Sequence, residues 1–370
     1  MTTLHDAAIL GATPAGFAAA YRLAKAGADV IVLDSPAIPA QCPLTDWTSA
    51  DFFRLPGLPA GLARAAKSRP FQTVHYHSVA LDRYAEHHSR SAMGYFLQSS
   101  RLTAVLAAAA RKAGARRRSW EAVPLIRRDE DRIVLSGASE IAARVLLLIQ
   151  GQPEEAMSHL GLTTRTMRPP PLIVAGLDVP TTQRPDGALH VVEEPERSEI
   201  GMFFVAEGNL HLRVISSSPA AGTRAAELSA LVARCQQAGA IPAKLPLHRA
   251  RGAVWRPPAG VALELETHVA KRCLLAGTAG GFADAVTGGT LYASVASALL
   301  AAEVAAKALE ADDLHATLAA FQTSWRRTLE QRLLQPATPF RVLLPLVFAN
   351  PKVASRLTAA LLYGQEGAEA

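Results

Sequence analysis

Residues 7–34 read AAILGATPAGFAAAYRLAKAGADVIVLD, and this stretch decides the fold. Ala7–Leu10 is a short apolar run typical of a buried parallel strand, and Asp29–Leu33 is a second such run. A glycine-bearing turn at 11–16 separates the first run from a helical pattern that ends at Gly27, a natural helix C-cap. The order strand, turn, helix, strand predicts a βαβ unit of the Rossmann type within an α/β fold.

The turn and the second strand together predict a dinucleotide site. A helix N-terminus offers free N–H groups and the positive end of its dipole to a pyrophosphate. In this pattern Gly11 makes the tight turn, Gly16 lets the helix pack close to the strand, and Asp34 accepts hydrogen bonds from a ribose. Thr13 stands where a middle glycine is expected, so an ordinary βαβ unit without a nucleotide stays open as an alternative. The candidate cofactor contacts here are Gly11, Thr13, Pro14, Ala15, Gly16 and Asp34.

Composition bounds the class of protein. A chain of 370 residues predicts two domains of ordinary size. Hydrophobic residues at 49%, charged residues at 19% and a mean hydropathy of +0.14 exclude a largely disordered chain. The net charge of +6 favours an anionic cofactor or lipid headgroup, and we predict no nucleic-acid partner from it.

The cysteines and the apolar runs bear on location. Cys42, Cys235 and Cys273 are far apart and form no CxxC pair, which predicts reduced thiols in a cytoplasmic protein and no structural zinc site. No uninterrupted apolar run reaches the ~20 residues that cross a bilayer. Phe340–Ala349 is apolar but contains Arg341 and Pro345, so we expect it to lie against a membrane or to close a pocket.

The remainder of the chain predicts a second domain and further helices. Short runs of alternating polarity between 169 and 270, such as Leu210–Ile215 and Val261–Thr267, are typical of an antiparallel sheet. Ala80–His88 and Ser100–Ala113 have helical patterns. The other expected elements are strands at Val123–Leu135, Ala143–Ile149 and Lys271–Ala276, a glycine-rich turn at 277–281, and a long alanine-rich helix at about 289–309.

Four segments resemble the flavin-binding motifs of FAD-dependent oxidoreductases of the hydroxylase and geranylgeranyl reductase group. The first is the 11–34 stretch, and the last is LLAGTAGGFADAVTGGTLYASVASALLAAE from Leu274. Between them, GYFLQSSRLTAVLAAAARKAGA from Gly94 and LLLIQGQPEEAMSHLGL from Leu146 occur in the family's order. The C-terminal helices are more similar to the geranylgeranyl reductases than to the hydroxylases.

The resemblance implies further contacts with FAD, and it also shows departures from the family pattern. Thr13, Gln150 and Thr278 stand where the pattern has glycine, aspartate and aspartate. Thr278 can still accept a hydrogen bond from the ribityl chain, but without a charge, at an expected loss of ~1–2 kcal/mol. The remaining cofactor contacts that the resemblance implies are Arg101, Gly151, Gly277, Thr278, Gly288 and Gly289.

The resemblance implies an organisation and an activity. The expected parts are an FAD-binding domain from 1–168 with an excursion at about 36–99, an inserted antiparallel-sheet substrate domain at 169–270, a second part of the FAD-binding domain at 271–310, and a C-terminal helical segment at 311–370. The implied activity is the FAD-dependent reduction of an apolar small molecule or lipid, prenyl or polyene in kind, by a cytoplasmic enzyme that can contact a membrane surface. The alternatives are a flavin monooxygenase and a non-catalytic descendant that binds a lipid or a partner. No catalytic residue is predicted.

The histidines His75, His77, His87 and His88 raise the question of a metal. An HxH pair on a strand places both rings on one face. No nearby carboxylate or cysteine completes a site in the sequence, so no metal is predicted. A buried free thiol is the preferred interpretation of Cys42.

Overall fold

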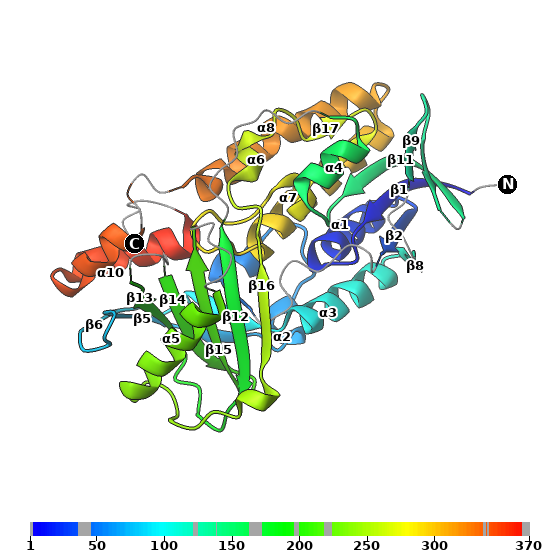
Figure 1. Ribbon diagram of the computed structural model, residues 1–370. Helices are drawn as coiled ribbons and strands as arrows, with labels where there is room; N and C mark the ends of the chain where they lie inside the picture. The colour runs from blue at the N-terminus through cyan, green and yellow to red at the C-terminus, as the bar shows by residue number, and fades with distance from the viewer. Residues whose placement is uncertain are drawn as a thin grey trace.

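The computed structural model describes residues 3–35, 46–120, 125–137, 139–162, 172–195, 200–217, 224–335, 338 and 340–364. Cys42 lies outside these residues. Figure 1 shows a parallel sheet with helices packed against it, a second sheet beside it, and helices at the C-terminal end of the chain that close over the second sheet. The fold is therefore α/β with a second, largely antiparallel sheet, as the sequence predicts; within that sheet only β13 and β5 pair in parallel among the described strands.

The predicted βαβ unit is confirmed. It consists of β1 (Leu4–Leu10), α1 (Pro14–Lys25) and β2 (Val30–Asp34). The strand order of the first sheet is β17-β18-β11-β1-β2-β8, and β1 pairs in parallel with both β11 and β2. The other strands of this sheet are β8 (Arg116–Ser119), β9 (Leu125–Arg128), β10 (Ile133–Ser136), β11 (Glu140–Leu148), β17 (Val269–Ala270) and β18 (Cys273–Leu275).

One face of this sheet is covered by helices with small side chains. The long helix α7 (Leu291–Glu310) packs against α1 and α8 (Leu314–Leu333), and α1 also packs against α3 (Ser99–Lys112). Alanines fill these contacts, which lets the helix backbones approach closely. The helix α7 is long and apolar enough to cross a membrane by length and composition, but 72% of its apolar window is buried inside the fold, as in a core helix.

The second sheet has the order β16-β12-β15-β14-β13-β5-β6. The predicted strand at Leu210–Ile215 is confirmed within β15. One face packs against α5 (Arg224–Gln237) and the other against the C-terminal segments. The strands are β5 (Thr73–His77), β6 (Tyr84–His88), β12 (Ile173–Pro180), β13 (Ala188–Glu193), β14 (Ile200–Ala206), β15 (Asn209–Ser216) and β16 (Arg251–Trp255).

Two local predictions were wrong. Ala80–His88 contains β6 rather than a helix, because Tyr84, Glu86 and His88 pair with β5 in an antiparallel ladder. Val261–Thr267 contains the short helix α6 (Val261–Glu264) rather than a strand. The Ala262 N–H there donates to the carbonyl of Gly281 at 3.2 Å, a long-range contact that no local pattern signals.

The C-terminal segment closes one end of the second sheet. Phe340, Leu344 and Val347 are buried in the core that the C-terminal segment forms with this sheet, while Val342 and Leu346 are about half exposed. The remaining elements are β3 (Asp46–Ser49), β4 (Arg69–Phe71) and β7 (Gly94–Leu97), which form a third sheet, and η1 (Ala50–Arg54), α2 (Leu62–Ala65), α4 (Pro153–His159), η2 (Leu247–Arg249), η3 (Gly277–Gly280), α9 (Phe340–Leu343), η4 (Leu344–Phe348) and α10 (Pro351–Tyr363).

The close approach of α1 to β1 depends on Gly16. A Cβ atom at this residue would lie 1.9 Å from the carbonyl oxygen of Gly11, inside any possible contact distance. Because that oxygen belongs to the backbone, it cannot move aside without displacing the turn. Gly16 therefore has the packing role that the sequence assigns to it.

We predict that Gly16→Ala lowers the free energy of unfolding by roughly 3 kcal/mol, because overpacking outweighs the gain of about 1 kcal/mol for alanine in a helix. Gly252→Ala is the matched control, since a Cβ there would meet atoms at 3.7 Å or more. Urea denaturation of both variants measures the difference. Equal stability of the two would contradict the close packing of α1 on Gly11.

Candidate cofactor site and interdomain cavity

Three turns meet where the strands β1, β11 and β18 end. Gly11 follows β1 with φ +132°, and a Cβ there would lie 2.7 Å from the Cβ of Gln150. Gly151 follows β11 with φ +131°. Gly277 follows β18, and its N–H donates to Ser297 Oγ at 3.0 Å. In doubly wound sheets, ligands bind in the crevice beyond these carboxyl ends.

Thr13 acts as the N-cap of α1. Its Oγ1 accepts a hydrogen bond from the Gly16 N–H at 3.2 Å, and its carbonyl accepts from the Phe17 N–H at 2.9 Å. Pro14 has no N–H to offer. In the first turn of α1, as far as the structure describes it, this leaves the Ala15 N–H for a phosphate. The anion-binding end of the helix is present, but it has fewer free donors than the glycine fingerprint supplies.

Asp34 already has a cationic partner. Arg117 on β8 forms an ion pair with the Asp34 carboxylate, and the Arg117 guanidinium lies 6.0 Å from the centre of the Phe17 ring. Both side chains of the pair are partly exposed to solvent. The next residue, Ser35, is buried, and its hydroxyl has no partner among the described residues. A ribose that binds the Asp34 carboxylate would therefore have to displace the guanidinium of Arg117.

Arg101 reaches the second domain. Its guanidinium is 3.2 Å from Glu207, which lies in the turn between β14 and β15. Arg69 approaches the same carboxylate at 3.5 Å. The structure thus places Arg101 in a contact between α3 and the second sheet.

Thr278 is buried, and its hydroxyl donates to the carbonyl of Ile149 over a long 3.5 Å. Because that bond uses the hydrogen, the oxygen remains an acceptor for a ligand hydroxyl. The structure brings Gly277 and Thr278 to the edge of the sheet where Gly11 and Gly151 lie.

Gly288 and Gly289 precede α7, which begins at Leu291, two residues later than the sequence predicts. Asp284 organises this loop: its carboxylate accepts from the Val286 and Thr287 N–H groups at 3.0 and 2.8 Å. The Gly288 N–H donates to the Asp284 carbonyl, and the Gly289 N–H donates to Thr287 Oγ1. Burial raises the pKa of Asp284. The N–H groups of residues 286–289 are thus satisfied within the loop.

A narrow cavity of about 60 Å³ lies between this loop and the second sheet. Most of the residues that line this cavity were not among the site residues predicted from the sequence. Thr48 is buried there, and its hydroxyl has no partner among the described residues. Arg332 enters from α8, with its guanidinium 3.5 Å from the centre of the Tyr292 ring and 2.9 Å from Asp51.

The sheet side of the cavity also carries charge. Arg213 is buried in β15 and lies 2.9 Å from Asp178, which is also 2.9 Å from His211. The burial of Arg213 in β15 depends on long-range packing, which explains why the sequence did not single it out. The apolar part of the lining consists of Trp47, Val174, Met202, Ile215, Trp255, Leu291, Ala293, Leu361 and Leu362.

Comparison with known proteins agrees with this arrangement. Residues 5–136 match the family model described as FAD binding domain. A geranylgeranyl bacteriochlorophyll reductase-like protein from Thermoplasma acidophilum superposes with a TM-score of 0.75 at 16% identity, over 99% of this chain and 98% of that one. The fold is that of the FAD-dependent reductases and hydroxylases.

Two further solved structures share this flavoprotein fold. The p-nitrophenol 4-monooxygenase PnpA from Pseudomonas putida DLL-E4 gives a TM-score of 0.67 at 16% identity, with 100% of both chains covered. The flavin-dependent monooxygenase PieE, in complex with FAD and substrate, gives 0.68 at 15% identity and covers 99% of this chain and 73% of its own. No curated protein matches. The matched domain implies FAD as the cofactor.

The residues present fit the backbone requirements of FAD. Gly11 and Gly16 keep the turn free of side chains where the structure has no room for a Cβ. Asp34 and Thr278 supply acceptors at two separate points, and the buried hydroxyl of Ser35 lies beside the first. The fit differs from the family pattern in the donors at Thr13 and in the pairing of Asp34.

His268 connects the turn at η3 to the C-terminal helices of this flavoprotein fold. It is fully buried, and Nε2 is 2.8 Å from the carbonyl oxygen of Gly280, to which it donates. Its ring packs against Phe282 and Trp325. Burial lowers the pKa of His268 to about 4, so the ring is neutral near pH 7.

This histidine makes stability depend on pH. Because its pKa in the folded state lies below the ordinary value of 6.5, the unfolded chain binds the proton first. The contribution is complete above pH 6.5 and is lost as pH falls towards about 4. We predict that His268→Gln removes on the order of 3 kcal/mol of this pH-dependent loss. The control is the exposed His315→Gln. Chemical denaturation at several pH values measures both, and parallel profiles for all three proteins would refute the assignment.

Proposed function

We propose that this protein is an FAD-dependent oxidoreductase. The observation that carries the proposal is that the turns after β1, β11 and β18 come together at one edge of the parallel sheet. FAD, when bound, would supply hydride transfer or oxygen activation. The protein would supply binding, orientation and a water-poor surrounding.

The roles of the chain's own residues follow from their contacts. The positive end of α1 and the Ala15 N–H would hold the pyrophosphate. Asp34 would accept from the ribose once Arg117 turns outward, which its exposed position permits. Thr278 would accept from the ribityl chain, because its own hydrogen is directed to Ile149.

The proposed substrate is an apolar small molecule or lipid, prenyl or polyene in kind, which the enzyme would reduce. The apolar side chains of the cavity support this class of substrate. A cavity of about 60 Å³ is far below the range of ligand sites, so the second sheet and the loop at Asp284 would have to separate when a substrate binds. Hydroxylation is the alternative reaction, and the fold shared with PnpA supports it.

A non-catalytic descendant is the second candidate function. Three observations favour it: Thr13 accepts from an N–H of the first turn of α1, Arg117 pairs with Asp34, and the Asp284 carboxylate accepts from two N–H groups of its own loop. Such a protein would keep the flavoprotein fold and bind a lipid or a partner without FAD. The two candidates differ in whether the purified chain takes up FAD.

Asp34→Asn should weaken FAD binding about 10-fold, because a charge-assisted hydrogen bond to the ribose becomes a neutral one. Asp29→Asn is the matched control. Asp29 precedes the other end of β2 and forms the equivalent ion pair with Arg116 on β8, but it lies away from the cofactor turn. Fluorescence titration with FAD measures both affinities. If both variants lose affinity equally, Asp34 has no specific role; if the wild type takes up no FAD, the second candidate replaces the first.

We also propose a cytoplasmic location with contact to a membrane surface. Val342 and Leu346 are half exposed on the segment that the sequence singled out, and the net charge of +6 would favour anionic headgroups.

The double variant Val342→Ser, Leu346→Ser should bind anionic phosphatidylserine-containing vesicles about 10-fold more weakly than the wild type, because two apolar side chains are lost. The matched control is Leu247→Ser, Val254→Ser, which removes two equally exposed apolar side chains elsewhere. Vesicle sedimentation at low and high salt provides the measurement. Two results would contradict a specific contact by this segment. The wild type could fail to bind the vesicles, or both double variants could bind more weakly than the wild type by the same factor.

A further inference from the structure

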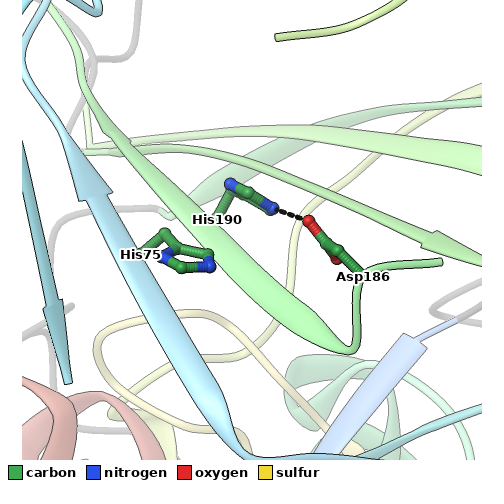
Figure 2. Close-up of side chains that lie close together, drawn as sticks. All are labelled: His75, Asp186 and His190. Carbon is green, nitrogen blue, oxygen red and sulfur yellow. Dashed lines mark hydrogen bonds and ion pairs between the residues drawn. The ribbon is translucent and has the colours of Figure 1, made fainter. Parts of the chain in front are cut away.

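Three strands at the edge of the second sheet place histidines and acids side by side. His190 on β13 lies opposite His75 on β5, which in turn lies opposite Glu86 on β6. On its other side, His190 lies opposite Phe203 on β14. Asp186 precedes β13 and turns back towards His190, as Figure 2 shows.

The potential ligand atoms of His75, Asp186 and His190 all lie within 4.8 Å of one another. His190 Nε2 is 2.7 Å from the Asp186 carboxylate. The two imidazoles are mostly buried, with side-chain exposures of 18% and 14%, whereas Asp186 is 48% exposed. The cluster therefore has two mostly buried imidazoles and one half-exposed carboxylate.

Both histidines are oriented by a second layer of contacts. The Tyr84 hydroxyl contacts Nδ1 of His75 and also donates to Glu86 at 2.6 Å. Nδ1 of His190 is 3.0 Å from Nε2 of His77. Histidines that bind metals are commonly held in this way through their other ring nitrogen, which fixes the direction of the ligand nitrogen.

The cluster lies on the face of the sheet away from the interdomain cavity. The His190 ring stacks on Phe203 with centroids 4.2 Å apart, and Phe203 belongs to the core beneath α5. The neighbouring Met202 points to the opposite face and lines the cavity. A ligand in the cluster would thus be separated from the proposed flavin site by the sheet.

We propose that His75, Asp186 and His190 bind a divalent transition-metal ion such as Zn²⁺. Two imidazoles and one carboxylate are the donor set that such ions take in proteins, and three protein ligands leave a position for water. The ion would replace the hydrogen between His190 and Asp186. Ligand atoms around a tetrahedral zinc ion lie about 3.3 Å apart. His190 Nε2 and the Asp186 carboxylate, now 2.7 Å apart, would therefore separate slightly, and ligand atoms up to 4.8 Å apart would approach one another. The half-exposed Asp186 side chain, which also accepts from the Ala188 N–H, is the group with most room to adjust.

Burial and neighbouring rings also change the pKa of two histidines in this group, His75 and His77. Burial, followed by the neighbouring His190, lowers the pKa of His75 below 6.5. The same two causes lower the pKa of His77 to about 4. Neutral imidazoles are the form that binds metal near pH 7.

The test uses the full chain, freed of metal by a chelator and then titrated with Zn²⁺ by calorimetry, with Co²⁺ absorption as a probe of coordination. We expect one ion per chain and a raised melting temperature. His75→Asn, His190→Asn and Asp186→Asn should each lower affinity more than about 100-fold, while His77→Gln, outside the ligand set, should lower it about 10- to 100-fold. His88→Asn is the matched control, since His88 lies on the same face of β6 as Glu86 but its Nδ1 is hydrogen-bonded to the Thr73 hydroxyl.

The outcomes separate a built site from surface chelation. Loss in the three ligand variants with retention in His88→Asn supports the proposal, and no uptake by the wild type overturns it. Equal losses in all variants, His88→Asn included, would also overturn it. Melting curves of the metal-free variants check that each variant folds. If a histidine variant is destabilised, the affinity of Asp186→Asn decides the outcome, because the Asp186 side chain is half exposed.

Discussion

The contact between the Gly11 carbonyl and the α carbon of Gly16 is the constraint on which the rest of the arrangement depends. It holds the first turn of α1 against the end of β1, at the edge where β11 and β18 also end. A side chain at either glycine would meet backbone or Gln150. Because α1 is fixed in this way, α7 and α3 can pack on it through small side chains. The βαβ unit, the glycine turn at 277–281 and the helical layer thus form one connected core.

Within this scaffold, several polar groups that a cofactor would use are already paired inside the chain. Thr13 caps Gly16, Arg117 pairs with Asp34, and Asp284 binds the amides of its own loop. If FAD binds as proposed, each pairing would have to be exchanged or bypassed, which would lower the affinity for FAD without changing the fold. The ion pair of Asp34 is exposed and so contributes little by itself, which makes it the easiest to exchange.

Local pattern was enough to predict the parts of the fold with short-range causes. The unit from Ala7 to Asp34 and the helix after Gly289 could be predicted because hydrophobic period and glycine placement act within a few residues. The segments at 80–88 and 261–267 could not, because pairing with β5 and contact with Gly281 decided them. The proposed metal site could not be predicted for the same reason. The sequence singled out His75, but Asp186 and His190 lie beside it only because β13 pairs in parallel with β5. Arg117 likewise reaches Asp34 through the pairing of β8 with β2.

We infer that this chain binds FAD in the crevice beyond the parallel strands. The visible absorption spectrum of the purified wild-type protein, after incubation with FAD and removal of the free cofactor, tests this directly. FAD bound in the crevice should remain with the protein, at up to one flavin per chain and with bands shifted from those of free FAD. A colourless protein after incubation with excess FAD would contradict this inference and favour the non-catalytic descendant.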